Sequence, residues 1–409
     1  MRRTAGVVAL VVLSTTAVAG PAWAGGSSGD GPLLEVTAAV ETPALFDDEA
    51  GGDADADDPA IWVNRADKSR SRVIGTAKNG GLRVYDLAGR EVQSILPPEG
   101  GRFNNVDLVT GFGAKRHDYA VVTDRGQDKL RIYRIEASGK LTDVTAADAP
   151  LLFSRDQAEV ETQATGYGLA TYGRYAVVSR RHSTTLGIFR LEERNNTVTY
   201  RVTDKLDLPK QFRLSTGATW TPCSEPGEDP QIEGMVVDSQ AGVLYAAQED
   251  VALWKIRLDR DRFAGVPRIV ERVAEFGAPG TYDPETEECA LGDPAPEAGR
   301  IRADVEGASI YPTGKSDGYL VVSSQGDSKF YVYDRRTNRP LSSFQVLDGT
   351  RTDGVQHSDG AAATSVSLPG YPKGLLVLHD GENKPDDGRV STNFKYVDWR
   401  ALNLRGSRH

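Results

Sequence analysis

The sequence is poor in the residues that several common enzyme classes depend on. It contains 2 cysteines and 5 histidines among 409 residues. Cys223 and Cys289 are not spaced as zinc ligands, and no histidine stands near them in the sequence to complete such a site. The chain also lacks a G-x-S-x-G nucleophile elbow, a phosphate-binding P-loop and an H-E-x-x-H zinc motif. These absences argue against a zinc enzyme, a P-loop nucleotidase and a hydrolase with a serine nucleophile on such an elbow.

Positive charge is also in short supply. The chain has 48 basic and 58 acidic side chains, which gives a formal net charge of −10 at pH 7. A protein that binds nucleic acid needs a basic surface to neutralise phosphates, so no nucleic acid is expected as a partner. An acidic balance is compatible instead with an exported protein that binds cations.

Long hydrophobic runs are absent except at the N-terminus. An Arg-Arg pair precedes an apolar stretch at 6–20, and Ala-Trp-Ala at 22–24 fits the small-x-small rule for cleavage. Residues 1–24 are therefore predicted to be a secretory signal peptide, and the protein to be secreted and extracellular. The alternative is an uncleaved membrane anchor, for which the run is short. No later segment is suited to cross a membrane, so no membrane partner is expected.

The two cysteines fit an exported chain, in which such a pair is more often bridged than free. Both lie in insertions rich in proline, glycine and acidic residues, at 213–230 and 277–300. We interpret them as a staple between loops.

A pattern of short strands recurs six times along the chain. Its centre is an apolar strand, a polar loop and a second strand that carries an aromatic residue. The copies are 72–87, 119–135, 175–191, 244–258, 319–335 and 375–399. Each copy is preceded by another short strand, and most are followed by a fourth. The pattern predicts an all-β fold, a six-bladed β-propeller of four-stranded antiparallel blades; a β-sandwich is the competing architecture and fits a recurrent four-stranded unit less well.

The repeats also define the domain organisation. Residues 25–52 form an N-terminal segment rich in glycine, serine and aspartate, with a possible strand at 33–41. The propeller, as the catalytic domain, is predicted to span 53–409. Because little chain remains after Trp399 for a fourth strand in the sixth blade, we expect 33–41 to complete that blade and close the ring.

Carboxylates return at the start of the first strand in each repeat. In the stretch 53–62, four aspartates fall within six residues just before Pro59 and an apolar strand. Crowded like charges repel one another unless a cation binds between them, and hard oxygen ligands suit Ca²⁺. The alternative for one such cluster is a solvated acidic turn. The recurrence favours a cation site, and the residues concerned are Asp57, Asp58, Asp107, Glu161, Glu233, Asp304, Glu306 and Asp359.

In a propeller, the start of the first strand and the loop between the second and third strands open on the same face. We therefore expect a ring of carboxylates at one mouth of the central channel, with Tyr167 facing it. The loops of the first three repeats add cations, and those of the last three add acidic or amide groups. These residues are Lys78, Arg125, Arg180 and Arg181, then Glu249, Gln325, Asp327, Asp380, Glu382 and Asn383, with His182 and His379 as accessory residues. A cationic half beside a calcium-binding half suits a polyanionic substrate, for which phosphate is the natural candidate.

The motifs DDPAIWV, NNVD, IEGM, EDVALWK, DVEG, SSQGDS, TDG, SDG and DGEN follow one another in this order between residues 53 and 399. In these motifs the chain resembles the β-propeller phytases, a family of secreted, calcium-dependent, alkaline or neutral phosphatases that hydrolyse myo-inositol hexakisphosphate (phytate). The resemblance implies a phosphoric monoester hydrolase of the 3-phytase type. It also implies several Ca²⁺ ions, an inositol polyphosphate substrate bound as its calcium complex, and direct attack on phosphorus by a calcium-activated water.

The resemblance further implies roles for individual residues. The metal ligands would be Asp57, Asp58, Glu233, Glu249, Asp304, Glu306, Asp353 and Asp359. The catalytic and phosphate-binding residues would be Lys78, Arg125, Tyr167, Arg181 and Glu233. Arg181 stands where relatives commonly have lysine, and Asn79 stands where they often have a second lysine, which weakens one phosphate contact. The two cysteine-bearing insertions exceed the pattern of the shorter relatives, and we expect a Cys223–Cys289 bridge on the mouth face.

Two other functions stay open on the sequence alone. A calcium-dependent propeller lactonase or similar hydrolase would also use a central calcium, but it would not need cations in three successive loops. A non-enzymatic exported binding propeller would use calcium only to make its loops rigid. A monomer is expected, because nothing in the sequence calls for a larger assembly.

Overall fold

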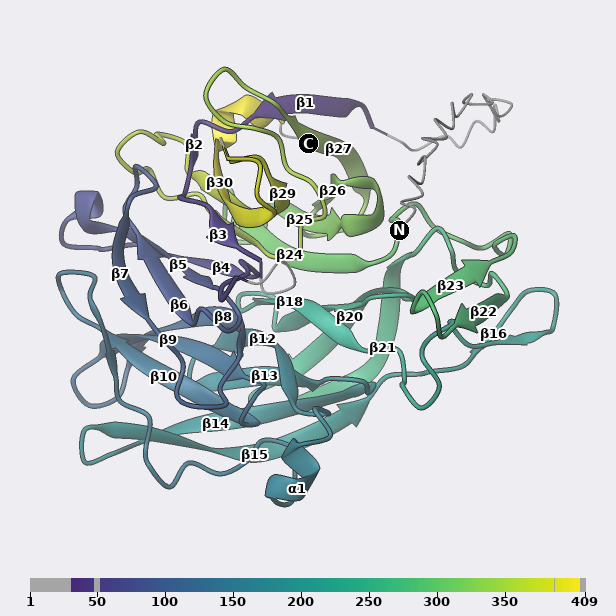
Figure 1. The fold of residues 1–409 in the computed structure, drawn as a ribbon, viewed down its shortest axis with the longest axis horizontal. Helices are drawn as coiled ribbons and strands as arrows, with labels where there is room; N and C mark the ends of the chain where they lie inside the picture. The colour runs from purple at the N-terminus through teal and green to yellow at the C-terminus, as the bar shows by residue number, and fades with distance from the viewer. Residues whose placement is uncertain (1–30, 48–51, 386, 405–409) are drawn as a thin grey trace, which may run out of the picture.

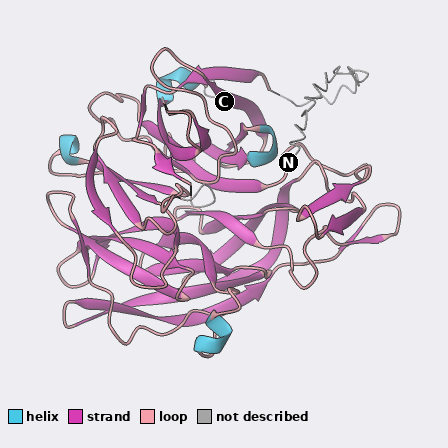
Figure 2. Ribbon diagram, in the orientation of Figure 1, coloured by secondary structure: helices cyan, strands magenta, loops and turns pink. Residues whose placement is uncertain are grey.

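The structure is a computed structural model that describes residues 31–47, 52–385 and 387–404. Within these residues, β-strands form six large sheets arranged as blades around a central channel (Figure 1). Helices are limited to short turns, namely α1 (Gln157–Val160), η1 (Lys68–Arg70), η2 (Gln325–Asp327) and η3 (Trp399–Leu402) (Figure 2). The predicted six-bladed β-propeller is confirmed. No helix of the described residues has the length and apolar character of a membrane span, and the predicted signal peptide at 1–24 lies outside these residues.

The first three blades are four-stranded antiparallel sheets, in which the first strand lines the channel and the others follow outward in chain order. Blade 1 contains β4 (Pro59–Trp62), β5 (Arg72–Thr76), β6 (Leu82–Tyr85) and β7 (Glu91–Ile95). Blade 2 contains β8 (Phe103–Phe112), β9 (His117–Asp124), β10 (Lys129–Ile135) and β11 (Leu141–Asp143). Blade 3 contains β12 (Gly166–Tyr172), β13 (Tyr175–Arg180), β14 (Thr185–Arg194) and β15 (Thr197–Asp207).

The last three blades follow the same plan, but blade 6 draws only three strands from the C-terminal part of the chain. Blade 4 contains β18 (Ile232–Asp238), β19 (Val243–Gln248), β20 (Ala252–Asp259) and β21 (Arg262–Arg272). Blade 5 contains β24 (Val305–Pro312), β25 (Gly318–Ser324), β26 (Lys329–Asp334) and β27 (Pro340–Leu347). Blade 6 contains β28 (Ala361–Thr364), β29 (Leu375–Asn383) and β30 (Ser391–Asp398).

The N-terminal strands complete two blades rather than one. β1 (Leu33–Thr37) pairs in parallel with β27 as a fifth strand of blade 5. β2 (Val40–Glu41) and β3 (Leu45–Phe46) pair antiparallel with β30 in blade 6 (Figure 1). The expectation that 33–41 completes blade 6 is therefore correct only for its last residues: Val40–Glu41 pair with β30 and close the ring, whereas Leu33–Thr37 join the neighbouring blade.

Burial decreases from the middle of each blade toward its outer edge. The run Tyr119–Asp124 in β9 and all of β25 are buried, whereas no residue of β7 is. A strand whose two faces are both covered by neighbouring blades has apolar residues at consecutive positions. The second strands are therefore the easiest to recognise in the sequence. The hydrophobic core therefore lies between adjacent blades, and it holds the first strands rigidly around the channel.

Two hairpins project from the blades beside blade 4. β16 (Phe212–Arg213) pairs with β17 (Thr219–Trp220), and β22 (Gly280–Asp283) pairs with β23 (Glu288–Leu291). A disulfide between Cys223 and Cys289 joins these two insertions. The predicted staple between loops is therefore confirmed.

Candidate active site

The site is built by irregularities at the start of the first strands. In blades 2 to 5 the pairing of the first strand with the second shifts register within its first residues. A β-bulge of this kind re-aims the side chains of the residues it contains. The residues within the four shifts are Asn104 with Asn105, Tyr167 with Gly168, Glu233 with Gly234, and Glu306 with Gly307.

The glycines in these pairs let neighbouring first strands touch backbone to backbone. A Cβ on Gly234 would lie 2.3 Å from the carbonyl oxygen of Glu306, and one on Gly168 would lie 2.0 Å from that of Glu233. Real Cβ atoms do not approach a carbonyl oxygen so closely, so no larger residue fits without a backbone shift. The polar residue before each glycine is thereby brought next to the polar residue of the following blade.

Three buried glutamates converge as a result. Glu233, Glu249 and Glu306 each offer a carboxylate oxygen, and these oxygens all lie within 4.8 Å of one another. Glu233 and Glu306 come from first strands, and Glu249 follows β19 in blade 4. Burial raises the pKa of all three, and repulsion between neighbouring carboxylates raises it further. We call these residues the glutamate cluster.

Glu233 is oriented by two donors from blades 2 and 3. The Tyr167 hydroxyl donates to its Oε2 at 2.5 Å, and the Asn104 amide donates to its Oε1 at 2.5 Å. Tyr167 itself is buried, and its ring lies under the guanidinium of Arg125, at 5.8 Å from the ring centroid. Both oxygens of Glu233 are thus fixed by hydrogen bonds.

Further carboxylates surround the glutamate cluster. Asp57 is buried, and Asp359 accepts a hydrogen bond from the Gln325 amide at 2.5 Å. Burial raises the pKa of Asp304, and Asp250, Asp359 and Glu233 raise it further. These carboxylates, which come from blades 1, 4, 5 and 6, therefore lie close to one another, and their role as metal ligands stays a prediction.

The donor set fits a hard cation. Among the described residues, Asp57 Oδ2, Glu249 Oε1 and Glu306 Oε2 are buried oxygens without a hydrogen-bond partner. A buried carboxylate oxygen without a donor is costly, and a bound cation removes that cost. All of these groups are oxygen ligands, and no sulfur or imidazole belongs to the glutamate cluster. The cluster can therefore bind a metal ion of the kind that prefers oxygen.

Cationic side chains flank the carboxylates on the side of blades 1 to 3. Lys78 Nζ lies 2.6 Å from Asp55 Oδ2. Burial lowers the pKa of this lysine, but Asp57, Asp359 and Asp55 raise it more, so that the ammonium stays charged. The predicted cationic loop of blade 1 therefore faces the carboxylates, and Arg125 in the loop of blade 2 is close enough to lower the pKa of Glu233.

Three arginines lie near one another, and one of them, Arg125, packs over the ring of Tyr167. Arg125 donates to Asn104 Oδ1 at 2.9 Å. Burial lowers the pKa of Arg125, and the nearby guanidinium groups of Arg102 and Arg181 lower it further. Like charges held together in this way form a strong site for an anion.

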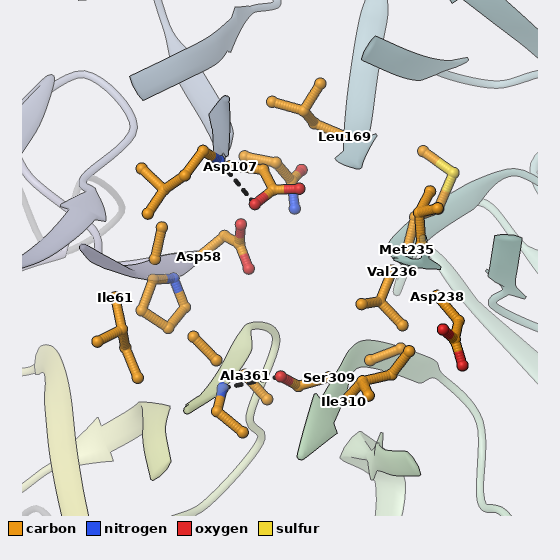
Figure 3. A pocket seen from close by; sticks show the side chains of 18 of the residues that line it. Asp58, Ile61, Asp107, Leu169, Met235, Val236, Asp238, Ser309, Ile310 and Ala361 are labelled. Atoms are coloured by element: carbon orange, nitrogen blue, oxygen red, sulfur yellow. Dashed lines mark hydrogen bonds between the residues drawn. The ribbon is translucent and has the colours of Figure 1, made fainter. Parts of the chain in front are cut away.

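The central channel continues below the glutamate cluster. It holds a cavity of about 350 Å³ lined by first strands from all six blades. Asp58 and Asp107 lie beside each other at one side of this cavity, with Met235 and Asp238 across from them (Figure 3). Asp58 accepts a hydrogen bond from the backbone of Val106, and Asp107 accepts from Thr171. Both line the channel, and burial, Asp107 and Glu233 raise the pKa of Asp58.

Several residues predicted for the mouth lie elsewhere. Glu161 is exposed at the end of α1, because β12 begins only at Gly166. Arg180 turns away and contacts Glu159 and the backbone of Ala164. Their expected roles at the mouth are wrong.

Asp353 also has a different environment from the other predicted metal ligands. It contacts the buried ammonium of Lys395, which also meets Asp380 Oδ2 at 3.2 Å and Glu41 Oε2 at 2.6 Å. The loop of blade 6 thus joins a second acidic group centred on Lys395, separate from the glutamate cluster.

Sequence reasoning missed several polar residues that hold the site together. Asn104 stands in the NNVD motif but was not assigned a role, although it contacts both Glu233 and Arg125. Gln231 donates to Glu249 Oε2 at 2.9 Å. Arg102 comes two residues before Asn104 and stands next to Arg125. Their position at the start of a predicted first strand, or just before it, was the available signal.

A known protein family matches most of this chain. A family model described as Phytase matches residues 2–195 and 227–405. The chain is 33% identical over 380 residues to the 3-phytase of Bacillus subtilis (strain 168), and the match covers 90% of this chain and 85% of the relative. Among solved structures, the β-propeller domain of Myceliophteria thermophila Cps50 (Swd1) has 10% identity and a TM-score of 0.37, with 84% of this chain and 83% of that chain covered. The computationally designed Ika8 protein has 10% identity and a TM-score of 0.34, with 83% and 70% covered.

Proposed function

Because the chain belongs to the phytase family and is a phytase, a phosphoric monoester hydrolase, we propose that it hydrolyses phytate in a calcium-dependent reaction by direct attack of water on phosphorus. The observation that carries the proposal is the glutamate cluster with its unpartnered buried oxygens, placed beside Lys78 and three arginines.

Calcium fits the donors better than other common cations do. The cluster and its surroundings supply carboxylates from several blades, and Ca²⁺ accepts six to eight oxygen ligands in flexible geometry. The crowding of Asp57, Glu233, Glu249, Asp304, Glu306 and Asp359 supports more than one ion. When bound, such ions supply charge toward phosphate oxygens and lower the pKa of a coordinated water.

The chain's own residues have separate tasks in this reaction. Arg125, held by Asn104, and Arg181 bind phosphoryl oxygens, since guanidinium groups pair with two oxygens at once. Lys78 contributes a point charge, because its ammonium is kept ionised by the adjacent carboxylates. The Tyr167 hydroxyl fixes the orientation of Glu233, a proposed metal ligand. These groups stabilise the charge that shifts onto the phosphoryl oxygens as the ester bond breaks.

The proposed substrate complements the charge of the site. Phytate is a polyanion, and it would meet acidic residues unless cations accompany it. We therefore propose that it binds as its calcium complex, with one phosphate near the arginines and another near the carboxylates. The residues of the site all come from the blades of one chain, which supports a monomer as the active form.

The place of action is proposed to be outside the cell. The N-terminal sequence has the pattern of a secretory signal. The Cys223–Cys289 bridge is the kind of bond that persists in an oxidising compartment. Both features support export.

The test is phosphate release from phytate by the purified 25–409 chain, with calcium and with EGTA. Release that requires calcium is expected, and Asp304→Ala is expected to abolish it while the circular dichroism spectrum is unchanged. Glu285→Gln, at an exposed position, is the control that should keep full activity. Equal release in EGTA, or no release by the folded protein in calcium, would contradict the proposal.

A further inference from the structure

The disulfide fixes a loop segment beside the site. The segment 223–231 runs from Cys223 to Gln231, just before β18; we call it the stapled segment. Residues 196–226 lie outside the family match, so the beginning of this segment is a particular feature of this chain. Cys223, at the start of the stapled segment, is bonded to Cys289 on β23. Gly280 on β22, the partner strand of β23, packs against Cys223.

The stapled segment holds the residue that follows Arg181. His182 Nδ1 lies 2.6 Å from Glu228 Oε1. The backbone N–H of His182 donates to Gln231 Oε1 at 3.0 Å, and its carbonyl accepts from the N–H of Asp229 at 3.3 Å. All three contacts come from the stapled segment.

These contacts support a backbone conformation that is otherwise unfavourable. His182 has a φ of 55°, in the left-handed region that side chains with a Cβ adopt at a cost. The turn that contains it also carries Arg181, whose backbone N–H donates to the carbonyl of Thr165 at 2.8 Å. The direction of the Arg181 side chain therefore depends on a turn that is clamped from both sides.

Gln231 links the same turn to the glutamate cluster. Its Oε1 accepts from His182, while its Nε2 donates to Glu249 Oε2 at 2.9 Å. The backbone of Glu249 returns a hydrogen bond to the Gln231 carbonyl at 3.2 Å. One side chain thus fixes the spacing between a phosphate-binding arginine and a metal ligand.

We propose that Glu228 and Gln231 are positioning residues of the phytase reaction, which hold Arg181 and Glu249 at the spacing that one bound phosphate requires. Neither residue touches the substrate. The stapled segment acts as a brace for the Arg181–His182 turn, and the disulfide keeps the brace in place. This inference rests on the proposed function, because it assigns the spacing to phosphate bound beside the glutamate cluster.

The first experiment is steady-state kinetics of Glu228→Gln with phytate at saturating calcium. The variant weakens the close contact between Glu228 and His182 Nδ1, and a loss of about 1.4 kcal/mol corresponds to tenfold, so KM is expected to rise up to about tenfold. The kcat should fall as well, because Arg181 is also proposed to stabilise the charge that develops on the phosphoryl oxygens. The matched control is Glu285→Gln, the same change of charge at an exposed position in the turn between β22 and β23, for which the KM of the parent is expected.

The second experiment is a double-mutant cycle that joins Glu228→Gln with Cys223→Ser/Cys289→Ser. If the disulfide acts by holding the stapled segment in place, removing the disulfide alone should raise KM. In the Glu228→Gln background its removal should raise KM little further, because the effects of substitutions on coupled groups do not add. Gln231→Ala is expected to raise KM and also to raise the calcium concentration needed for half-maximal activity, since Glu249 loses its donor.

The outcomes are distinct. Unchanged KM in Glu228→Gln, with a lowered Tm, would make the contact merely structural and overturn the inference. An equal rise of KM in Glu285→Gln would show that the effect comes from the change of net charge and not from the contact with His182, and it would also overturn the inference. Absence of phosphate release by the parent protein would instead contradict the proposed function, and binding of inorganic phosphate by calorimetry would then compare the same variants.

Discussion

Glu306→Gln is expected to stabilise the protein without calcium and to weaken its response to calcium. The substitution keeps the volume of the side chain but removes one of three charges whose oxygens lie within 4.8 Å. At that distance and an effective dielectric constant of about 20, each pair of charges repels by about 3 kcal/mol. Removing the charge of Glu306 therefore relieves a few kcal/mol of repulsion in the metal-free protein, while it deprives a bound cation of one ligand.

The pH dependence of this effect has a defined sign. Burial first, and then Glu233 and Glu249, raise the pKa of Glu306 above its usual value. The folded state therefore binds this proton more tightly than the unfolded state does, and its contribution to stability is lost as pH rises toward and through the raised pKa. Since the glutamine that replaces Glu306 cannot titrate, the advantage of the variant in EGTA should grow as the pH rises.

Calorimetric unfolding of the parent and of Glu306→Gln, each in EGTA and in calcium, tests both expectations: the higher stability without calcium and the weaker response to calcium. The variant should have the higher Tm in EGTA and the smaller rise on calcium addition, whereas Glu285→Gln at an exposed position should match the parent in both conditions. A variant that is less stable in EGTA would show that the charges do not repel as argued. An undiminished response to calcium would show that Glu306 is not a ligand.

Three other changes probe different parts of the structure. Tyr167→Phe removes the 2.5 Å donor to Glu233, a hydrogen bond to a charged group, so kcat/KM should fall about 10- to 100-fold, and a change within twofold in a phosphate-release assay would refute this. Arg335→Met leaves the buried Asp238 carboxylate unpaired and should lower the free energy of unfolding by about 3–5 kcal/mol in urea denaturation. Burial raises the pKa of Asp238, but Arg335 and other donors lower it overall, so this pair's contribution in the parent should be lost in acid, and equal losses at pH 7 and pH 3 would contradict that account. Gly234→Ala places a Cβ against a backbone carbonyl of the next blade and should cost about 1–3 kcal/mol of stability together with calcium affinity; unchanged calcium binding by calorimetry would argue against the close packing.

Much of the fold could be predicted because the blades carry a regular signal. Second and third strands are covered on both faces, so runs such as 119–122 and 319–322 are apolar throughout and easy to recognise. The N-terminal segment gives no comparable signal. A parallel partner such as β27 is not announced by a hairpin turn, and the break after Thr37 falls among small residues.

The glutamate cluster could be predicted because its residues share a local pattern. Glu233 and Glu306 each precede a glycine at the start of a first strand, and the glycine is demanded by close packing. Glu161 stands upstream of a first strand too, but it caps the end of α1, and the loop 162–165 separates it from β12. Its position in the sequence was therefore a poor guide to its position in space.

The environment of Asp353 could not be predicted from its position in a motif, and its role as a metal ligand stays a prediction. The strand β29 continues to Asn383, so the acidic loop of blade 6 meets Lys395 instead of the glutamate cluster. A buried lysine on the opposing strand β30 decides the environment of these carboxylates, and no local pattern reveals which loop it will face. Partners of this kind become visible only once strands distant in sequence are paired.

The way in which the ring closes sets the order of assembly. Residues 40–46 pair with β30 near the other end of the chain, and β1 needs β27. The N-terminal strands β1, β2 and β3 can therefore pair only after strands near the C-terminal end have been synthesised. Contacts between segments so distant in sequence make folding slow. The glutamate cluster and its neighbours draw on residues from Asp57 to Asp359, so they converge only when the circle is complete. Cations bound by these residues would stabilise only the completed propeller. Folding would then go to completion most readily in a compartment where such cations are abundant.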